Sequence, residues 1–153
     1  MITKKPKVLA VSSGGGHWVQ LLRLRPAFEG AEVVFATVKR EYRLDVGDAE
    51  FRVIHDGNRS QKIALIKSAI SIVFILLVEK PDLVISTGAA PGYFAVRLGK
   101  LLGMRTIWVD SVANADELSM SGRKAGECVD LWLTQWPHLA KEGGPRFFGS
   151  VIS

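Results

Sequence analysis

The clearest chemical signal in the sequence is a run of small residues that ends in a histidine, Ser12-Ser13-Gly14-Gly15-Gly16-His17. It joins a predicted strand at residues 7–13 to a predicted helix at 17–28. Glycines let backbone N–H groups turn toward a ligand, and a helix amino terminus adds partial positive charge, so this loop suits a phosphate or a diphosphate. A tight turn without a ligand is the alternative. The loop lacks the Gly-Lys-Ser/Thr of a P-loop, and Val19 stands where a dinucleotide-binding loop needs Gly or Ala.

His17 enters the predicted helix directly after the glycines. Histidine titrates nearest to neutral pH, so His17 could take the proton from an attacking hydroxyl group as a catalytic base. Beside a diphosphate it could instead donate a hydrogen bond. Both roles stay open from the residues alone. The candidate substrate-binding residues of this loop are Ser13, Gly14, Gly15 and Gly16.

Two further segments place small or polar residues after predicted strands. Thr87-Gly88-Ala89-Ala90-Pro91-Gly92 follows a strand at 82–86 and would let a ligand approach the backbone; close helix–sheet packing is the alternative. Asp110 ends a strand at 105–109 and is the second catalytic candidate, expected on the rim of the same crevice. Serine and asparagine side chains follow it and suit sugar hydroxyls, although a serine there could simply cap a helix. The binding candidates from both segments are Thr87, Gly88, Ala89, Gly92, Ser111, Asn114, Ser119 and Ser121.

Strands and helices alternate along the chain, which predicts βαβ units and a parallel sheet with helices on both faces. Right-handed crossovers favour an α/β, Rossmann-like doubly wound sheet, in which the first and fourth strands are neighbours. Ligands bind at the carboxyl ends of the strands at that point, so the loops after Ser13 and Ser86 should form two walls of one crevice. The expected strands are 7–13, 32–38, 51–55, 82–86, 105–109 and 130–134, and the expected helices 17–28, 61–79, 91–102 and 119–126.

The helix expected at 61–79 is unusually apolar, because residues 63–78 read IALIKSAISIVFILLV. It is too short for a spanning helix, which needs about 20 apolar residues, and Lys67 interrupts it. It could be a buried helix, a helix that contacts a membrane surface between flanking lysines, or a contact with another subunit. The candidate membrane or partner contacts are Phe74, Ile75, Val78 and, from a later motif, Trp136.

Length and composition limit the function classes. At roughly 100–200 residues per domain, 153 residues predict one domain, 1–153. The first 67 residues hold 12 Lys/Arg and 7 Asp/Glu, so the net charge of +5 arises there and suggests an anionic partner. The single cysteine cannot form an internal disulfide, and with three histidines it offers no ordinary structural zinc site. No other metal-binding constellation is evident in the sequence and the dinucleotide-binding fingerprint is missing, so we expect neither a metal nor a cofactor. The basic excess shows no reader motif for nucleic acid.

Four motifs together resemble a known family. They are Ser12-Ser13-Gly14-Gly15-Gly16-His17, Ser86-Thr87-Gly88, Leu118-Ser119-Met120-Ser121-Gly122 and Leu133-Thr134-Gln135-Trp136-Pro137. The chain is similar, over nearly its whole length, to the acceptor-side subunit of two-component UDP-sugar transferases. That family includes the membrane subunit of the eukaryotic enzyme that adds the second N-acetylglucosamine to dolichol diphosphate, and bacterial exopolysaccharide glycosyltransferase subunits.

The resemblance implies the fold of the amino-terminal lobe of a GT-B glycosyltransferase, with a separate subunit supplying the lobe that binds the UDP-sugar. It implies that the two glycine loops bind a lipid-diphosphate-linked saccharide, that His17 is a candidate base and that Asp110 occupies a position where relatives often carry an acid. The reaction would be sugar transfer in polysaccharide or oligosaccharide biosynthesis, by a heteromer peripheral to the cytoplasmic face of the membrane. The alternative is a non-catalytic membrane scaffold that recruits a catalytic UDP-sugar-binding partner.

Overall fold

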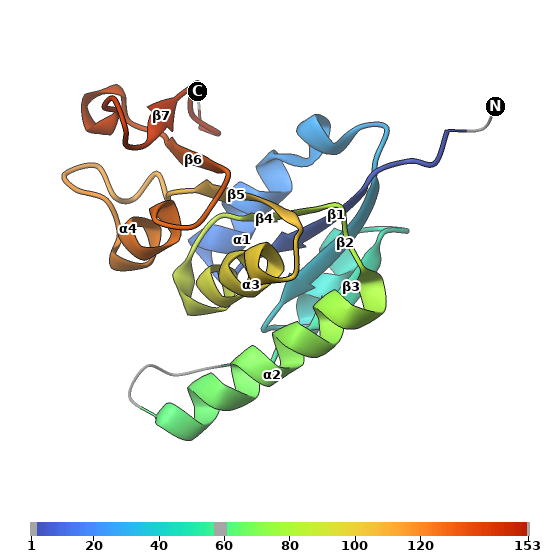
Figure 1. Ribbon diagram of the computed structural model, residues 1–153. Coiled ribbons are helices and arrows are strands. Elements are labelled where there is room, and N and C mark those ends of the chain that lie inside the picture. The colour runs from blue at the N-terminus through green and yellow to red at the C-terminus, as the bar shows by residue number, and fades with distance from the viewer. Residues whose placement is uncertain (1–2, 57–60, 153) are drawn as a thin grey trace.

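The described part of the protein folds around a parallel sheet (Figure 1). The structure is a computed structural model that describes residues 3–56 and 61–152. Within these residues the sheet has seven strands in the order β3-β2-β1-β4-β5-β6-β7, and every neighbouring pair is parallel. The strands are β1 Lys7–Val11, β2 Glu32–Thr37, β3 Glu50–Val53, β4 Leu83–Ser86, β5 Arg105–Val109, β6 Leu131–Thr134 and β7 Arg146–Phe147. This order confirms the predicted doubly wound, Rossmann-like fold.

Helices cover both faces of the sheet. This is required because successive side chains of β1 are apolar and point alternately to opposite faces. Leu9 and Val11 point into a core under α2, α3 and α4, whereas Val8 and Ala10 point into a second core under α1 and the 3₁₀ turns (Figure 1). The helices are α1 Gly16–Arg23, α2 Lys62–Glu79, α3 Ala89–Leu101 and α4 Met120–Gly126, and the 3₁₀ turns are Arg25–Phe28, Arg40–Asp45 and Pro137–Leu139.

The first and fourth strands are neighbours, as expected. Val11 at the end of β1 is in register with Ser86 at the end of β4, so the loops that follow leave the same edge of the sheet side by side.

Two expectations about the elements were less accurate. The helix expected at 17–28 ends at Arg23 and continues as a 3₁₀ turn, because Pro26 lacks the N–H that a longer helix needs. The two-residue strand β7 was not predicted, since it is too short to show a periodicity.

The helix α2 packs one side on the sheet and exposes an apolar side. Ile72, Ile75 and Leu76 belong to the core below α2, and Ile75 is only 6% exposed. The prediction that Ile75 contacts a membrane or a partner is therefore wrong. At 100° per residue, Ile75 lies on the sheet side, whereas its neighbour Phe74 points away and is 67% exposed. Of the two serines of α2, Ser68 is fully buried and Ser71 is partly buried, so neither lies on the exposed side.

The exposed side of α2 carries a continuous apolar row, which we call the α2 stripe. Its members recur at spacings of three and four residues and are all more than half exposed: Ile63, Ile66, Ile70, Phe74 and Leu77. Val78 lies beside the row and is 56% exposed. No other element covers the stripe among the residues that the structure describes. Over those same residues, no helix combines the length and the apolar character needed to cross a bilayer.

A buried carboxylate ties the end of α2 to two strands. Glu79 Oε2 lies 2.8 Å from Lys7 Nζ of β1, and Oε1 lies 2.6 Å from Arg52 Nη2 of β3. Burial alone would raise the pKa of Glu79, but the Lys7 hydrogen bond and the charge of Arg52 outweigh it, so this pKa lies below its ordinary value. The same hydrogen bond raises the pKa of Lys7. The ionised pair is thus part of the folded state near neutral pH.

We expect Glu79 to make the protein sensitive to acid. Because its pKa is lowered on folding, its stabilising contribution is complete above the unfolded value of about 4.3 and is lost as the pH falls through the folded value. Glu79→Gln should lower the free energy of unfolding near pH 7 by about 1–3 kcal/mol and flatten the loss of stability below pH ~4.5. Urea unfolding at several pH values measures both effects. Glu32→Gln is the matched control, since Glu32 is half exposed and 3.8 Å from the same lysine. Equal pH profiles for the two variants would contradict this role.

Candidate functional site

A cavity of about 370 Å³ lies at the carboxyl edge of the sheet, where the predicted residues should meet. Its walls come from the loops after β1, β4 and β5 and from the start of α4. Seven of the sequence candidates line it together: Ser13, His17, Ala89, Ser111, Asn114, Ser119 and Ser121. The position matches the switch point between β1 and β4, where ligands of such folds bind. Asp56, which follows β3 at the same edge, also lines the cavity and was not predicted.

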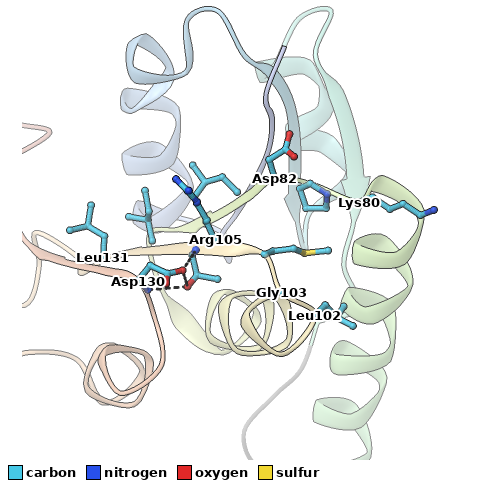
Figure 2. Close-up of a pocket in the computed structure, with 12 residues that line it drawn as sticks. Lys80, Asp82, Leu102, Gly103, Arg105, Asp130 and Leu131 are labelled. Carbon is cyan, nitrogen blue, oxygen red and sulfur yellow. Dashed lines mark hydrogen bonds between the residues drawn. The ribbon is translucent and has the colours of Figure 1, made fainter. Parts of the chain in front are cut away.

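A larger cavity of about 940 Å³ lies at the opposite, amino ends of β4, β5 and β6 (Figure 2). None of the candidates from the sequence lines it. Its carboxylates are already used by the fold: Asp82 accepts a hydrogen bond from Lys7 N, and Asp130 accepts from Thr106 and pairs with Lys100. Lys100 and the Thr106 hydrogen bonds hold the pKa of Asp130 below its ordinary value. We therefore place the functional site in the smaller cavity.

His17 is held in one orientation by the second glycine loop. Its Nδ1 lies 3.0 Å from the carbonyl oxygen of Thr87. A carbonyl oxygen can only accept, so Nδ1 carries a proton and donates, and in the neutral ring the free lone pair is on Nε2. The Thr87 hydroxyl in turn donates to the His17 carbonyl at 2.7 Å. The two loops are thus joined by a reciprocal pair of contacts, and no residue that the structure describes hydrogen-bonds the other ring nitrogen of His17, which lines the cavity.

Gly88 makes this arrangement possible. Its φ of 140° suits glycine, and a Cβ there would lie 2.4 Å from His17 Nδ1. Its N–H donates to the Ser86 hydroxyl, so that group is used within the protein. Gly92 has a different role: a Cβ would lie 1.9 Å from Ser86 Oγ, so the residue lets α3 pack closely on β4. Ala89 has a φ of 67°, a left-handed conformation that stores strain at the edge of the cavity.

The first glycine loop is bordered by two residues that the sequence did not single out. Tyr42 OH lies 3.1 Å from the N–H of Gly15, and a Cβ on Gly14 would lie 3.1 Å from Lys39 Cε. Lys39 directly follows the predicted second strand, so its place at this edge could have been inferred from the sequence. It brings a positive charge to a loop whose backbone already suits an anion.

Asp110 does not present its carboxylate to the rim. It is 2% exposed and accepts hydrogen bonds from Trp108 Nε1 at 3.0 Å, from Ser119 Oγ at 2.5 Å and from Ser119 N at 3.0 Å. Ser119 caps α4 by accepting from Gly122 N. A Cβ on Gly122 would lie 2.2 Å from Asp110 Oδ1, so the helix turn fits closely over the carboxylate. Asp110 therefore positions the start of α4, and a direct chemical role would need these contacts to open.

The remaining candidates divide between surface and interior. Phe74 and Val78 are exposed on α2, whereas Trp136 is partly buried and donates from Nε1 to the Val112 carbonyl at 2.8 Å. Trp136 thus supports the loop after β5 that lines the cavity. In the part of the chain that the structure describes, no cluster of histidine, cysteine and carboxylate side chains could hold a metal ion.

Comparison with known proteins identifies the family. Residues 49–151 match the family model described as oligosaccharide biosynthesis protein Alg14 like. The chain belongs to this Alg14-like family. A relative from Yarrowia lipolytica, named UDP-N-acetylglucosamine transferase subunit ALG14, is 27% identical over 169 residues, which cover 90% of this chain and 76% of the relative. The family resemblance inferred from the motifs is therefore confirmed.

Solved structures confirm the fold of this Alg14-like chain. MurG from Acinetobacter baumannii matches 95% of the chain with a TM-score of 0.76 at 14% identity. The UDP-N-acetylglucosamine 2-epimerase from Rickettsia bellii matches 97% with a TM-score of 0.73, also at 14% identity. The chain spans about half the length of each, 46% in both cases, which is the expected relation of one lobe to a two-lobed protein. Because the same fold also occurs in an epimerase, the likeness alone does not define the reaction.

Proposed function

We propose that this chain is the acceptor-binding subunit of a two-subunit glycosyltransferase. In this proposal a partner subunit binds the UDP-sugar, and the cavity described above binds a lipid-diphosphate-linked saccharide. The observation that carries it is His17, which Thr87 holds in a cavity at the switch point with an Nε2 lone pair that none of the described residues uses. The names of the family relatives support UDP-N-acetylglucosamine as the donor and make the chain one subunit of a larger transferase.

The geometry suggests which part of the acceptor each group of the cavity binds. Lys39 and the amides of the first glycine loop suit the diphosphate, and the serine and asparagine side chains suit the sugar hydroxyls. The acceptor hydroxyl would attack the anomeric carbon of the donor sugar while His17 Nε2 takes its proton, and UDP would leave with the electrons of the broken glycosidic bond. The Nδ1–H contact to the Thr87 carbonyl keeps the ring oriented with Nε2 toward the acceptor during this step.

Direct binding tests the assignment of the acceptor side. Without its partner, the chain should bind a short-chain polyprenyl diphosphate N-acetylglucosamine at least about tenfold more tightly than UDP-N-acetylglucosamine, a difference of about 1.4 kcal/mol. Fluorescence titration or calorimetry measures both constants. Lys39→Met should weaken the lipid complex by about three- to tenfold, because one exposed charge is lost beside the diphosphate. Lys5→Met, a change at an exposed lysine before β1, is the matched control. Tighter binding of the UDP-sugar would reverse the assignment.

We further propose that the α2 stripe contacts the membrane surface that carries the lipid acceptor. The stripe is apolar and exposed along the whole helix, and the exposed lysines Lys62 and Lys67 beside it suit anionic headgroups. A helix that rests in the interface needs this combination of an apolar outer face and neighbouring positive charge. The excess positive charge in the first 67 residues includes both lysines.

Substitutions on the stripe should separate membrane contact from folding. Replacing Ile70 and Phe74 by Glu should lower binding to vesicles containing phosphatidylglycerol at least about tenfold, because each buried apolar side chain contributes roughly 1.5–3 kcal/mol. Flotation measures the binding, and circular dichroism should show an intact fold. Leu44→Glu is the control for an exposed leucine elsewhere, and Ile75→Glu should instead unfold the protein. If vesicle binding is unchanged but binding of the partner subunit is lost, the stripe is a subunit contact.

A further inference from the structure

Two buried glutamines join α1 to the loops at the cavity. Gln20 of α1 is 6% exposed and Gln135, which follows β6, is 4% exposed. Gln135 Nε2 donates to Gln20 Oε1 at 2.6 Å and to the Asp110 carbonyl at 3.0 Å. Its Oε1 accepts from Val151 N at 3.0 Å and from Ser150 Oγ at 3.3 Å. Every hydrogen-bonding position of this amide is therefore filled.

The same holds for Gln20, and its contacts fix which way the amide faces. Gln20 Oε1 accepts from Val112 N at 3.0 Å as well as from Gln135, so the oxygen must lie on that side. Its Nε2 must then face the other way, where it donates to the Gly16 carbonyl at 3.3 Å and to Ser111 Oγ at 3.0 Å. A reversed amide would set N–H groups against N–H groups at two contacts. Gln135 thus fixes the orientation of the Gln20 amide. In this orientation the Nε2 donor of Gln20, and not its oxygen, lies beside Ser111 Oγ.

The contacts of the Ser111 hydroxyl leave it able to act only as a hydrogen-bond donor. Its Oγ accepts from Gln20 Nε2 and from Ala113 N at 3.2 Å, which uses both lone pairs of the hydroxyl. The hydroxyl hydrogen can therefore only be donated, and no described residue accepts it. Ser111 is 5% exposed and lines the cavity, so a ligand is the partner that this hydrogen can reach.

We infer that Gln20 and Gln135 are positioning residues that make Ser111 an obligate hydrogen-bond donor to the acceptor substrate. The inference rests on the proposed function for the identity of the ligand. The atom that Ser111 binds must be a hydrogen-bond acceptor, which on this substrate is an oxygen of the diphosphate, of the acetamido carbonyl or of a sugar hydroxyl. A buried hydroxyl that can only donate also disfavours a ligand that offers only a donor at this point, because both hydrogens would then lack an acceptor.

A double-mutant cycle tests the inference with the full chain. Ser111→Ala should raise the dissociation constant for polyprenyl diphosphate N-acetylglucosamine by about 5- to 50-fold, since a hydrogen bond in a buried site is lost. Gln20→Met should have a similar effect, and the double variant should bind no more weakly than the weaker single variant, because Gln20 acts through Ser111. In the assembled enzyme, KM for the lipid should rise in the same way while KM for the UDP-sugar stays unchanged.

A second substitution distinguishes positioning from simple packing. Gln20→Glu keeps the size of the side chain but replaces the donor beside Ser111 by a carboxylate oxygen, which would accept the Ser111 hydrogen and remove it from the ligand. It should therefore match Ser111→Ala in lipid binding, with thermal melting confirming that the fold is kept. If Gln20→Glu or Gln20→Met fails to fold, Ser111→Ala alone still decides the ligand contact.

The outcomes distinguish this inference from the proposed function. An unchanged lipid dissociation constant in Ser111→Ala, with normal binding by the wild type, overturns the inference and leaves the proposed function intact. Additive effects of Ser111→Ala and Gln20→Met overturn the positioning role. No lipid binding by the wild type overturns both. Repeating the titration with a glucose-bearing lipid, which lacks the acetamido group, tests the source of the oxygen: loss of the Ser111→Ala effect indicates the acetamido carbonyl, and a persistent effect indicates an oxygen of the diphosphate or of a sugar hydroxyl.

Discussion

Alone, the purified chain is expected to transfer no sugar from UDP-N-acetylglucosamine, and turnover should appear only after the partner subunit is added. The reason is physical. The cavity supplies a base and groups that suit the acceptor, but a transferase must also hold the donor with its anomeric carbon against the attacking hydroxyl. Under the proposed function the donor side comes from a partner, in line with relatives that are named as subunits of a UDP-N-acetylglucosamine transferase.

The measurement is product formation from radiolabelled UDP-N-acetylglucosamine and a polyprenyl diphosphate acceptor. The chain alone and the partner alone should each give below about 1% of the rate of the mixture, because lost orientation of the two reactants can account for many orders of magnitude in rate. A catalytically impaired partner added in equal amount controls for stabilisation of the chain by complex formation. Robust turnover by the highly purified chain, unaffected by added partner, would refute the two-subunit assignment.

The sequence predicted the sheet and the meeting of the loops because those depend on local patterns. Each expected strand is a short apolar run bounded by turn residues, and right-handed crossovers then place β1 beside β4 without further information. The positions of Ser13, His17, Ser111 and Asn114 around one cavity follow from that topology alone. The fold of the lobe is therefore encoded largely by the alternation of strands and helices.

The orientation of α2 could not be derived in the same way. Apolar residues surround the second half of the helix, so the pattern does not distinguish the side that faces the sheet from the side that faces away. Phe74 and Ile75 are equally apolar neighbours, and only tertiary packing buries one and exposes the other. The ion pairs of Glu79 with Lys7 and Arg52 help to fix this rotation, and they join residues far apart in the sequence.

Side-chain contacts between elements that are far apart in the sequence could not be predicted from it either. Asp110 was expected at the rim because it ends a strand, but Trp108 and Ser119 enclose its carboxylate. Gln20 and Gln135 carry no motif of their own, since an amide becomes informative only when its partners are known. Their role emerges from which atoms donate and which accept, and that depends on the packing of α1 against the loops after β5 and β6.

The test of His17 bears on the chemistry itself. In the assembled enzyme, His17→Ala should lower kcat by roughly 10²–10⁴-fold, the usual contribution of a general base, with little change in thermal stability. The structure adds a matched pair of variants. His17→Asn keeps an N–H near the place of Nδ1 for the Thr87 carbonyl but has no group at the place of Nε2. His17→Gln reaches toward the place of Nε2 and can donate a hydrogen bond, but it cannot accept a proton at neutral pH.

The pattern across the three variants decides the role of His17. If the ring is the base, all three should lose a similar factor in kcat, because none can accept the proton, and lipid binding should change little. If His17 instead binds the diphosphate, Gln should restore most of the activity and lipid affinity that Ala loses, while Asn should not. Near-wild-type kcat in Ala would refute both roles and favour a scaffold that holds the acceptor for a catalytic partner. Asp56, an acidic residue that lines the same cavity, would then be the next residue to replace.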